Sequence, residues 1–236
     1  MTRFVNRLVW AVLLLAVSAA CDRDNFGPYE ELEQTYGLTD FDRLAMGSAL
    51  RITVQQGAAF GVTVRGNRRD VEDLELTVRN NTLNARYRNW NRSRRYDTYV
   101  TVTMPTLRGV DFSGASKSTV AGFTSLRELD VTLSGASKSE LAVQADRLNL
   151  DVSGASKLDL TGRAGTLRGD VSGASKLYAF PFPVNEADLD VSGASKAELT
   201  VATALFVEAS GASDVRYRGN PTVQQRTTGA STVKKD

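Results

Sequence analysis

The sequence contains no histidine. This absence excludes Ser-His-Asp and Cys-His nucleophile arrangements, histidine metal ligands and a histidine pH switch. One cysteine, Cys21, is present, so an internal disulfide and any CxxC redox or zinc motif are also excluded. The formal net charge of +2 is too small to favour a general nucleic-acid binder. We therefore expect no metal, no cofactor and no nucleic-acid partner.

Residues 1–20 have the order of a bacterial export signal. Arg3 and Arg7 give a positive start, residues 8–17 form an apolar core too short to span a bilayer, and small residues follow. Cys21 comes directly after them, which resembles the lipobox of bacterial lipoproteins, where the cysteine is lipidated and becomes the mature N-terminus. Plain signal-peptidase cleavage before the cysteine is the alternative.

Lipidation at Cys21 would make the membrane a partner of the mature chain, because two or more acyl chains give firm anchoring. Loss of Arg3 and Arg7 leaves 27 basic and 27 acidic residues. Asp22 retains lipoproteins in the inner membrane of some bacteria, but we favour the outer membrane, with a periplasmic or surface-exposed domain. Residues 21–37 are polar and are predicted to be a tether, with room for a short helix over residues 29–35.

The second half of the chain repeats one tetrapeptide. SGAS begins at residues 113, 134, 153, 172, 192 and 210, and TGAS begins at residue 228. A period of about 20 residues indicates a solenoid, in which each repeat buries its apolar face by stacking on its neighbours.

Alternation of apolar and polar residues around each motif indicates strands. Leu148, Leu150 and Val152 lie on one face of such a strand, and no stretch shows helical spacing. The motif glycines are expected to bend the chain between strands: Gly114, Gly135, Gly154, Gly173, Gly193, Gly211 and Gly229. We predict an all-β fold, a parallel β-helix of about seven coils over residues 108–236. No six-residue sub-period typical of left-handed forms is present, which favours a right-handed helix.

Residues 38–107 show strand-like alternation without the motif, and Asn80-Asn81 is a predicted tight turn. This region forms either irregular first coils or a hairpin layer over the open end, where some cap is required. Residues 38–236 are expected to be one continuous domain.

Stacked coils would place equivalent motif residues in columns. One column holds five lysines: Lys117, Lys138, Lys157, Lys176 and Lys196. Another holds mainly carboxylates: Asp111, Thr132, Asp151, Asp170, Asp190 and Glu208. Either the two columns pair across the bend, which we favour, or the lysines form a positive strip for an anionic polymer.

A cluster of arginines and aromatics lies between two strand-like runs. Its candidate ligand-binding residues are Arg86, Arg88, Trp90, Arg92, Arg94, Arg95 and Tyr96. Guanidinium groups beside aromatic rings can grip anions and stack on sugars. The alternative is a solvated hairpin whose tyrosines and tryptophan pack on the cap.

No catalytic residues are assigned. SGASK differs from the S-x-x-K motif of serine acyl enzymes, because Ser116 stands three residues after Ser113 and Lys117 comes one later. A polysaccharide-acting β-helix enzyme would need carboxylates that converge in a groove, and the sequence shows no long loop to build one. Calcium-binding β-rolls have a different, nonapeptide repeat.

Several segments together resemble the head GIN domain, a family labelled "putative autotransporter adhesin". They are the export signal, the run YGLTDFDRLAMGSALRITVQQG, the step Met104-Pro105-Thr106-Leu107 and the serial SGASK units. The resemblance covers about residues 38–236 and implies a right-handed β-helix in a bacterial envelope lipoprotein, without catalytic residues.

The sequence thus predicts a non-enzymatic, lipid-anchored binding or adhesion module at the cell envelope, whose ligand is a polysaccharide or another anionic envelope polymer. A purely structural envelope protein is the first alternative, and a polysaccharide-acting enzyme is the second.

Overall fold

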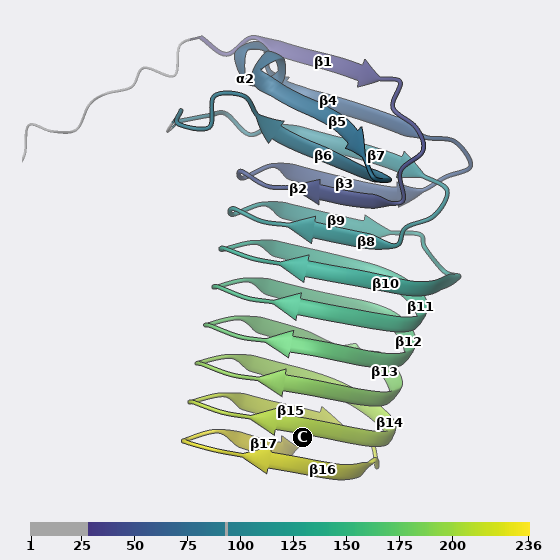
Figure 1. Ribbon diagram of the computed structural model, residues 1–236, viewed down its shortest axis with the longest axis vertical. Coiled ribbons are helices and arrows are strands. Elements are labelled where there is room, and N and C mark those ends of the chain that lie inside the picture. The colour runs from purple at the N-terminus through teal and green to yellow at the C-terminus, as the bar shows by residue number, and fades with distance from the viewer. Residues whose placement is uncertain (1–27, 93) are drawn as a thin grey trace, which may run out of the picture.

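The computed structural model describes residues 28–92 and 94–236, and nearly all of their regular structure is β-strand. These strands join in one continuous hydrogen-bonded sheet that coils round a long axis (Figure 1). The predicted export signal and Cys21 lie outside the described residues. The prediction of an all-β solenoid is confirmed.

The repeat region forms a regular stack of parallel strands. They are β8 (Gly109–Phe112), β9 (Lys117–Ala121), β10 (Leu126–Leu133), β11 (Lys138–Val152), β12 (Lys157–Val171), β13 (Lys176–Val191), β14 (Lys196–Ala209), β15 (Asp214–Arg218), β16 (Thr222–Thr227) and β17 (Thr232–Lys235). Equivalent residues lie side by side, for example Lys138 beside Lys157 and Val152 beside Val171. In Figure 1 the nearer strands run left, the farther strands run right and the chain descends, so the coil is right-handed, as predicted.

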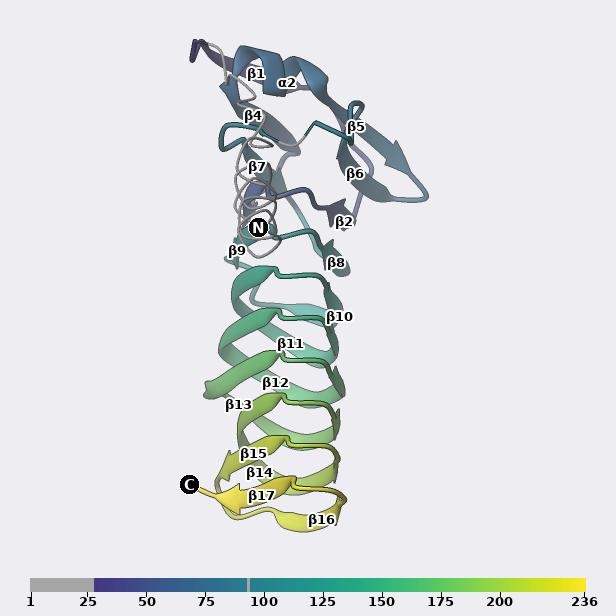
Figure 2. The same ribbon diagram turned by 90° about the vertical axis from the view of Figure 1, so that its left-hand side faces the viewer.

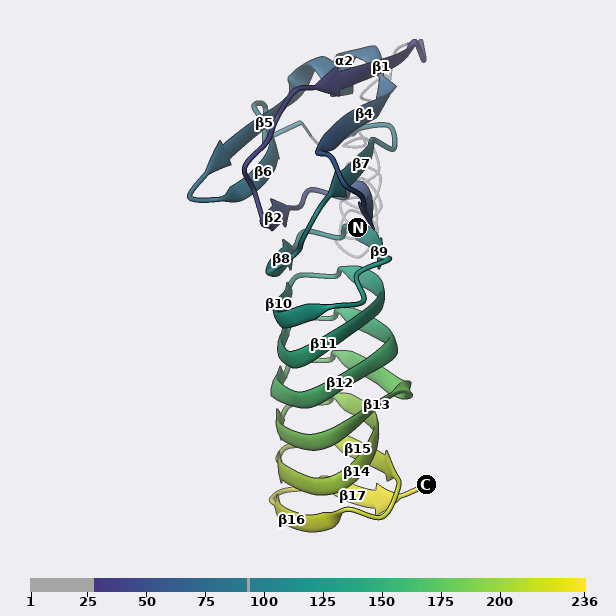
Figure 3. The same cartoon turned by 90° about the vertical axis from the view of Figure 1, so that its right-hand side faces the viewer.

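Each coil has two unlike edges. The SGAS turns stack into a narrow column that we call the turn edge, at the left of Figure 1. On the opposite side, the long strands β11 to β14 curve from one face to the other without a break, and we call this side the bend edge (Figure 3).

Glycine is required in the turns for two reasons. Gly154 has φ of 77°, in the region that disfavours other residues, and a Cβ there would stand 2.4 Å from the Gly135 carbonyl oxygen. That close approach lets the Ala155 amide donate to the same carbonyl at 2.7 Å, and the pattern recurs in later turns. All seven motif glycines have positive φ.

The interior is filled by columns of aliphatic side chains. One column runs through Phe112, Leu133, Val152, Val171, Val191 and Ala209, all of them buried. Burying each such side chain contributes about 1.5–3 kcal/mol relative to leaving it exposed. The last serine of each SGAS motif also points inward, and these serines are buried: Ser116, Ser137, Ser156, Ser175, Ser195 and Ser213.

The N-terminal region contains further strands and one helix. They are β1 (Glu31–Tyr36), β2 (Arg43–Met46), β3 (Arg51–Gln56), β4 (Gly61–Asn67), α2 (Arg68–Asp73), β5 (Leu74–Arg79), β6 (Thr82–Tyr87) and β7 (Tyr99–Met104). Asn80 and Asn81 both have positive φ in the turn between β5 and β6, as predicted.

Both structures predicted for this region occur in it. Strands β2 and β3 form a parallel coil in which Gly47-Ser48-Ala49-Leu50 takes the place of SGAS. Strands β1, β4 and β5 add antiparallel pairs that cover the open end. The stacking is out of chain order, because the β2–β3 coil lies between β6–β7 above it and β8–β9 below it (Figures 1 and 2).

Two local expectations are wrong. Residues 31–36, which we expected in the tether, form β1 and pair antiparallel with β4. The alternation there is weak because β1 is an edge strand with most side chains exposed. The helix α2 was not expected, since its six residues RRDVED contain one apolar side chain and so carry no helical periodicity.

Buried serines give a test of the interior. The Ser118 and Ser139 hydroxyls lie 2.7 Å apart and hydrogen-bond, whereas the buried Ser195 hydroxyl has no partner among the described residues. Ser139→Ala strands the Ser118 hydroxyl and is expected to cost about 1–2 kcal/mol, or roughly 2–8 °C in Tm. Ser195→Ala is expected to keep or raise Tm. Thermal unfolding followed by circular dichroism distinguishes them, and equal losses would contradict the assignment.

Candidate functional site

The arginine loop, residues 88–98, occupies the place of a turn. It connects β6 to β7, which stack directly above β2 and β3, so it lies over the first turn of the turn edge. The Arg51 amide donates to the Thr98 carbonyl at 2.9 Å and fixes one end of the loop. The Arg88 amide donates to the Asp73 carbonyl at 3.0 Å and fixes the other. The solenoid therefore has a long loop at this coil, whereas the remaining coils each have a four-residue turn at the same place.

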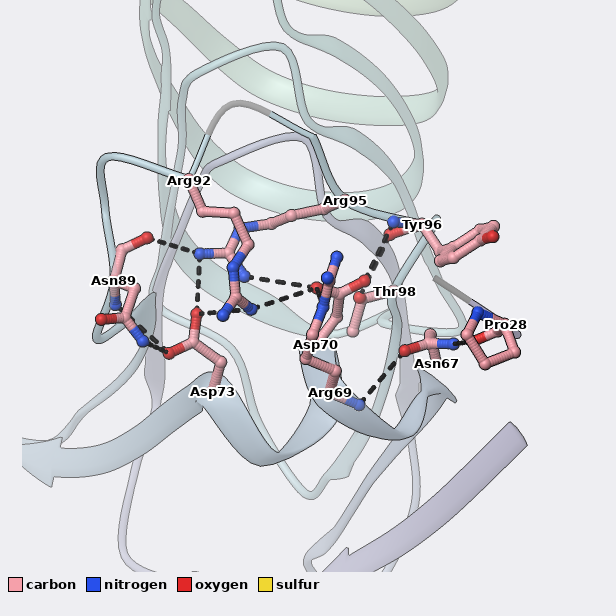
Figure 4. Close-up of polar contacts among 10 residues, drawn as sticks. All are labelled: Pro28, Asn67, Arg69, Asp70, Asp73, Asn89, Arg92, Arg95, Tyr96 and Thr98. Atoms are coloured by element: carbon pink, nitrogen blue, oxygen red, sulfur yellow. Dashed lines mark hydrogen bonds and ion pairs between the residues drawn. The ribbon is translucent and has the colours of Figure 1, made fainter. Parts of the chain in front are cut away.

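Helix α2 places two carboxylates beneath this loop. Asn67 caps the helix by accepting a hydrogen bond from the Arg69 amide at 3.2 Å. Asp70 and Asp73, three residues apart and therefore on one face, are both buried. Buried carboxylates require partners, and the arginine loop supplies them (Figure 4).

Two guanidinium groups neutralise these carboxylates, and amides of the loop donate hydrogen bonds to them. Arg95 lies 2.7 Å from Asp73 and 3.4 Å from Asp70, while Arg92 lies 3.7 Å from each. The Tyr96 amide donates to Asp70 at 3.0 Å, and the Asn89 side-chain amide donates to Asp73. These contacts hold the loop in one conformation. Two of the predicted binding arginines, Arg92 and Arg95, therefore have structural roles.

Burial raises the pKa of Asp73, but hydrogen bonds from Arg95 and Asn89 outweigh it and leave the pKa below the ordinary value of 3.8. Arg95 also stacks on Tyr87, with its guanidinium carbon 3.6 Å from the ring centroid. Burial of Tyr87 raises the pKa of its hydroxyl. Arg95 thus contacts both an aromatic ring and two carboxylates, and only 13% of its side chain is exposed.

The other predicted residues of the cluster differ in their surroundings. Arg86 pairs with Glu75 at 2.9 Å but remains 71% exposed, and Arg88 reaches only the Glu72 carbonyl at 3.5 Å. Trp90 is 88% exposed, so the expectation that the tryptophan packs on the cap is wrong. Tyr96 does pack, edge-on to Tyr29 with ring centroids 5.2 Å apart. Arg94 is exposed.

A concavity of about 900 Å³ lies between the loop, the β5–β6 hairpin and the first turn. It is lined by Ser48, Ala49, Glu75, Arg86, Tyr87, Arg88, Trp90, Arg92 and Arg95. A second hollow of about 460 Å³ on the loop's other side is lined by Tyr29, Arg95, Tyr96, Asp97 and Tyr99. The loop thus separates one surface of arginines and tryptophan from another rich in tyrosine.

The lysine column exists as predicted, with Lys117, Lys138, Lys157, Lys176 and Lys196 in register. Its pairing differs from the expectation. Lys138, Lys157 and Lys196 bind carboxylates two residues further along their own strands, at distances of 3.3, 2.8 and 2.6 Å. The hydrogen bond that Lys196 donates to Glu198 raises the pKa of Lys196. The described residues offer Lys117 and Lys176 no ion pair, so the column is not a continuous positive strip.

The carboxylate column lies on the other face of the coil. Asp151, Asp170, Asp190 and Glu208 stack in register on successive coils, beyond the turn from the lysines. The turn separates the columns because strands before and after it belong to opposite faces. Burial raises the pKa of Asp111, and the nearby Asp151 charge raises it further.

Asp70 and Asp73 were not predicted as site residues. The sequence shows only two carboxylates on one side of a short polar segment. Their role becomes clear only when the structure places the arginine loop over that segment.

Among residues 28–92 and 94–236, no helix is long and apolar enough to cross a bilayer. Within the same ranges, no cluster of three or more Asp, Glu, Cys or His side chains could hold a metal ion.

Asp73→Asn tests the loop network. At neutral pH it leaves Arg95 partly unpaired and is expected to cost roughly 3 kcal/mol. Because the folded-state pKa of Asp73 lies below 3.8, its stabilisation is complete at pH above about 5 and is lost as pH falls through the folded value. The deficit in Tm of the variant should therefore be full at pH 7 and shrink progressively as the pH falls below 3.8. A deficit independent of pH would contradict this account.

Comparison with known proteins supports the fold. A putative adhesin from Bacteroides fragilis superposes with a TM-score of 0.80 at 19% identity, covering 88% of this chain and 97% of the other. A putative lipid binding protein from Parabacteroides distasonis gives 0.72 at 13% identity, covering 88% and 97%. A putative adhesin from Parabacteroides merdae gives 0.70 at 16% identity, covering 88% and 96%.

No curated protein matches the sequence. The family model described as "Putative auto-transporter adhesin, head GIN domain" matches residues 40–221, which include the β2–β3 coil, the arginine loop and six of the seven motif turns. The chain therefore belongs to the head GIN domain family.

Proposed function

We propose that this protein is a non-catalytic binding module, held at the bacterial cell envelope by lipid on Cys21, that adheres to an acidic polysaccharide through its arginine loop. The observation that carries the proposal is Trp90, which is 88% exposed beside the arginine-lined concavity. Exposing so large an apolar ring has a cost in water that a binding surface would recover.

The loop is suited to this role because its conformation is set before a ligand arrives. Asp70 and Asp73 hold Arg92 and Arg95 in place, so little conformational entropy is lost on binding. Arg86 and Arg88 remain exposed and have guanidinium N–H groups for carboxylates or sulfates. Trp90 offers a flat face for a sugar ring.

Catalysis is less well supported than binding. Glycoside hydrolysis ordinarily uses two carboxylates that face one another across the scissile bond. The loop concavity has one carboxylate residue in its lining, Glu75, and Arg86 neutralises it. The described adhesins of similar fold and the family description also favour a binding role at the cell surface.

Replacement of Trp90 and Arg88 tests the binding surface without disturbing the buried ion pairs. Trp90→Ala and Arg88→Ser should each weaken binding to immobilised polygalacturonate by roughly tenfold, measured by biolayer interferometry at low salt. The matched controls are Phe206→Ala, an exposed ring on the solenoid, and Arg168→Ser, an exposed arginine on β12. Equal effects of all four variants, or no binding by the wild type to any acidic polysaccharide, would sink the proposal.

The anchor is tested separately in living bacteria. Radiolabelled palmitate should enter the wild-type protein and be absent from Cys21→Ser, because the thiol is the acceptor. The variant should also leave the membrane fraction after a salt wash, whereas the wild type stays. Labelling of Cys21→Ser at the wild-type level would overturn the anchoring proposal.

A further inference from the structure

A third hollow lies at the bend edge, far from the arginine loop. It has a volume of about 780 Å³ and extends over β10, β11, β12 and β13 to the middle of β14. Its polar lining includes Arg127, Gln144, Asp146, Arg163 and Asn185. We call it the bend-edge groove. It shares no residue with the loop concavity, and Figure 3 faces the edge that carries it.

The groove exists because the repeat is irregular there. Strand β13 contains Pro181 and Pro183, and its register against β12 and β14 shifts between residues 178 and 186. Proline cannot donate a ladder hydrogen bond, so the extra residues bulge outward, as Figures 2 and 3 show at β13. This bulge forms one wall, and the segment Thr124-Ser125 before β10 forms the other.

Gly165 lies in the floor of the groove, at a point where two coils approach closely. A Cβ at this position would stand 2.7 Å from the Asp146 carbonyl oxygen, so no side chain fits without moving the backbone. In register, Asp146 lies on the coil before Gly165 and Asn185 on the coil after it. Gly165 therefore places no side chain between these two polar groups, and Ala145 and Ala164 make the rest of the floor small and apolar.

The charged groups of the groove form no ion pair with any described residue. In the register of β10 and β11, Arg127 lies level with Asp146, yet neither forms an ion pair with any described residue. Arg163 donates to the Gln144 side chain at 3.1 Å and has no carboxylate partner. The neighbouring Glu128, by contrast, accepts from both Arg147 and Asn149. The groove therefore presents one carboxylate and two guanidinium groups that no described residue neutralises.

The groove does not suit an added peptide strand. Peptides that extend a sheet need a free strand edge, and the backbone here already pairs with coils on both sides, through Ala145, Ala164 and Val184. Recognition must come from side chains. Planar amides, a carboxylate and guanidinium groups over a small apolar floor suit vicinal hydroxyls, and two arginines against one aspartate favour a ligand with a carboxylate.

We propose that the bend-edge groove is a second saccharide site, for an oligosaccharide that contains uronic acid. Arg127 and Arg163 bind its carboxylates, while Asp146 and Asn185 bind its hydroxyls. Coils about 4.8 Å apart make the groove roughly 19 Å long from β10 to β14, enough for a short oligomer rather than one sugar. The proposal is independent of the arginine loop and does not require that the loop bind anything.

The test uses a chain in which the loop is disabled by Trp90→Ala and Arg88→Ser. Isothermal titration with a defined oligogalacturonate at low salt should show binding by this parent. Adding Arg127→Ser and Arg163→Ser should raise the dissociation constant by roughly tenfold or more. Adding Arg168→Ser, an exposed arginine on β12 outside the groove, should leave it unchanged.

A neutral malto-oligosaccharide of equal length provides the ligand control and should bind at least roughly tenfold more weakly. The proposal is overturned by a loop-disabled parent that does not bind oligogalacturonate, by equal binding of the neutral oligomer, or by groove variants that bind like the parent. Should only the loop substitutions affect binding in the otherwise unaltered chain, the loop proposal survives and the groove proposal fails. Loss confined to the groove variants gives the reverse result.

Discussion

The structure depends on the close approach of successive turns. At each regular turn, an alanine amide donates to the glycine carbonyl of the preceding coil, as Ala174 does to Gly154 and Ala194 to Gly173, both at 2.7 Å. Glycine adopts the positive φ at no steric cost, and it has no Cβ to clash with the neighbouring backbone at this short distance. This contact fixes the coil spacing and keeps the strands in register, so every recurring residue becomes a column, inside or outside the solenoid.

In the regular part of the solenoid, many side chains pack or pair within their own column or strand. Inside, aliphatic side chains stack on their own counterparts. Outside, three of the five column lysines have a carboxylate two residues further along the same strand. Two of the hollows lined by the described residues lie at interruptions of the repeat: the arginine loop, where a turn is replaced by residues 88–98, and the bend-edge groove, where β13 carries extra residues. In this solenoid, candidate binding surfaces arise where the repeat is broken.

The sequence was sufficient to predict whatever the repeat determines. The period, the alternation around each motif and the turn glycines gave the coil, its interior and the lysine column. The partners of the lysines were predicted wrongly, because the repeat does not show that strands on either side of a turn belong to opposite faces. Exposure of Trp90 and the structural roles of Arg92 and Arg95 could not be predicted either, since they depend on Asp70 and Asp73 in a helix without apolar periodicity. The out-of-order insertion of the β2–β3 coil depends on pairing between distant strands and likewise leaves no local signal.

The central claim is that equivalent motif positions are stacked one coil apart, and distances between spin labels measure this directly. Labels would be attached to cysteines at Lys117 and at Lys138, Lys157, Lys176 or Lys196, in a chain that carries Cys21→Ser. The account predicts backbone separations that grow in equal steps of about 4.8 Å, to roughly 19 Å for the pair 117 and 196. Separations that do not increase in even steps along the series would contradict the stacked coil and every column derived from it.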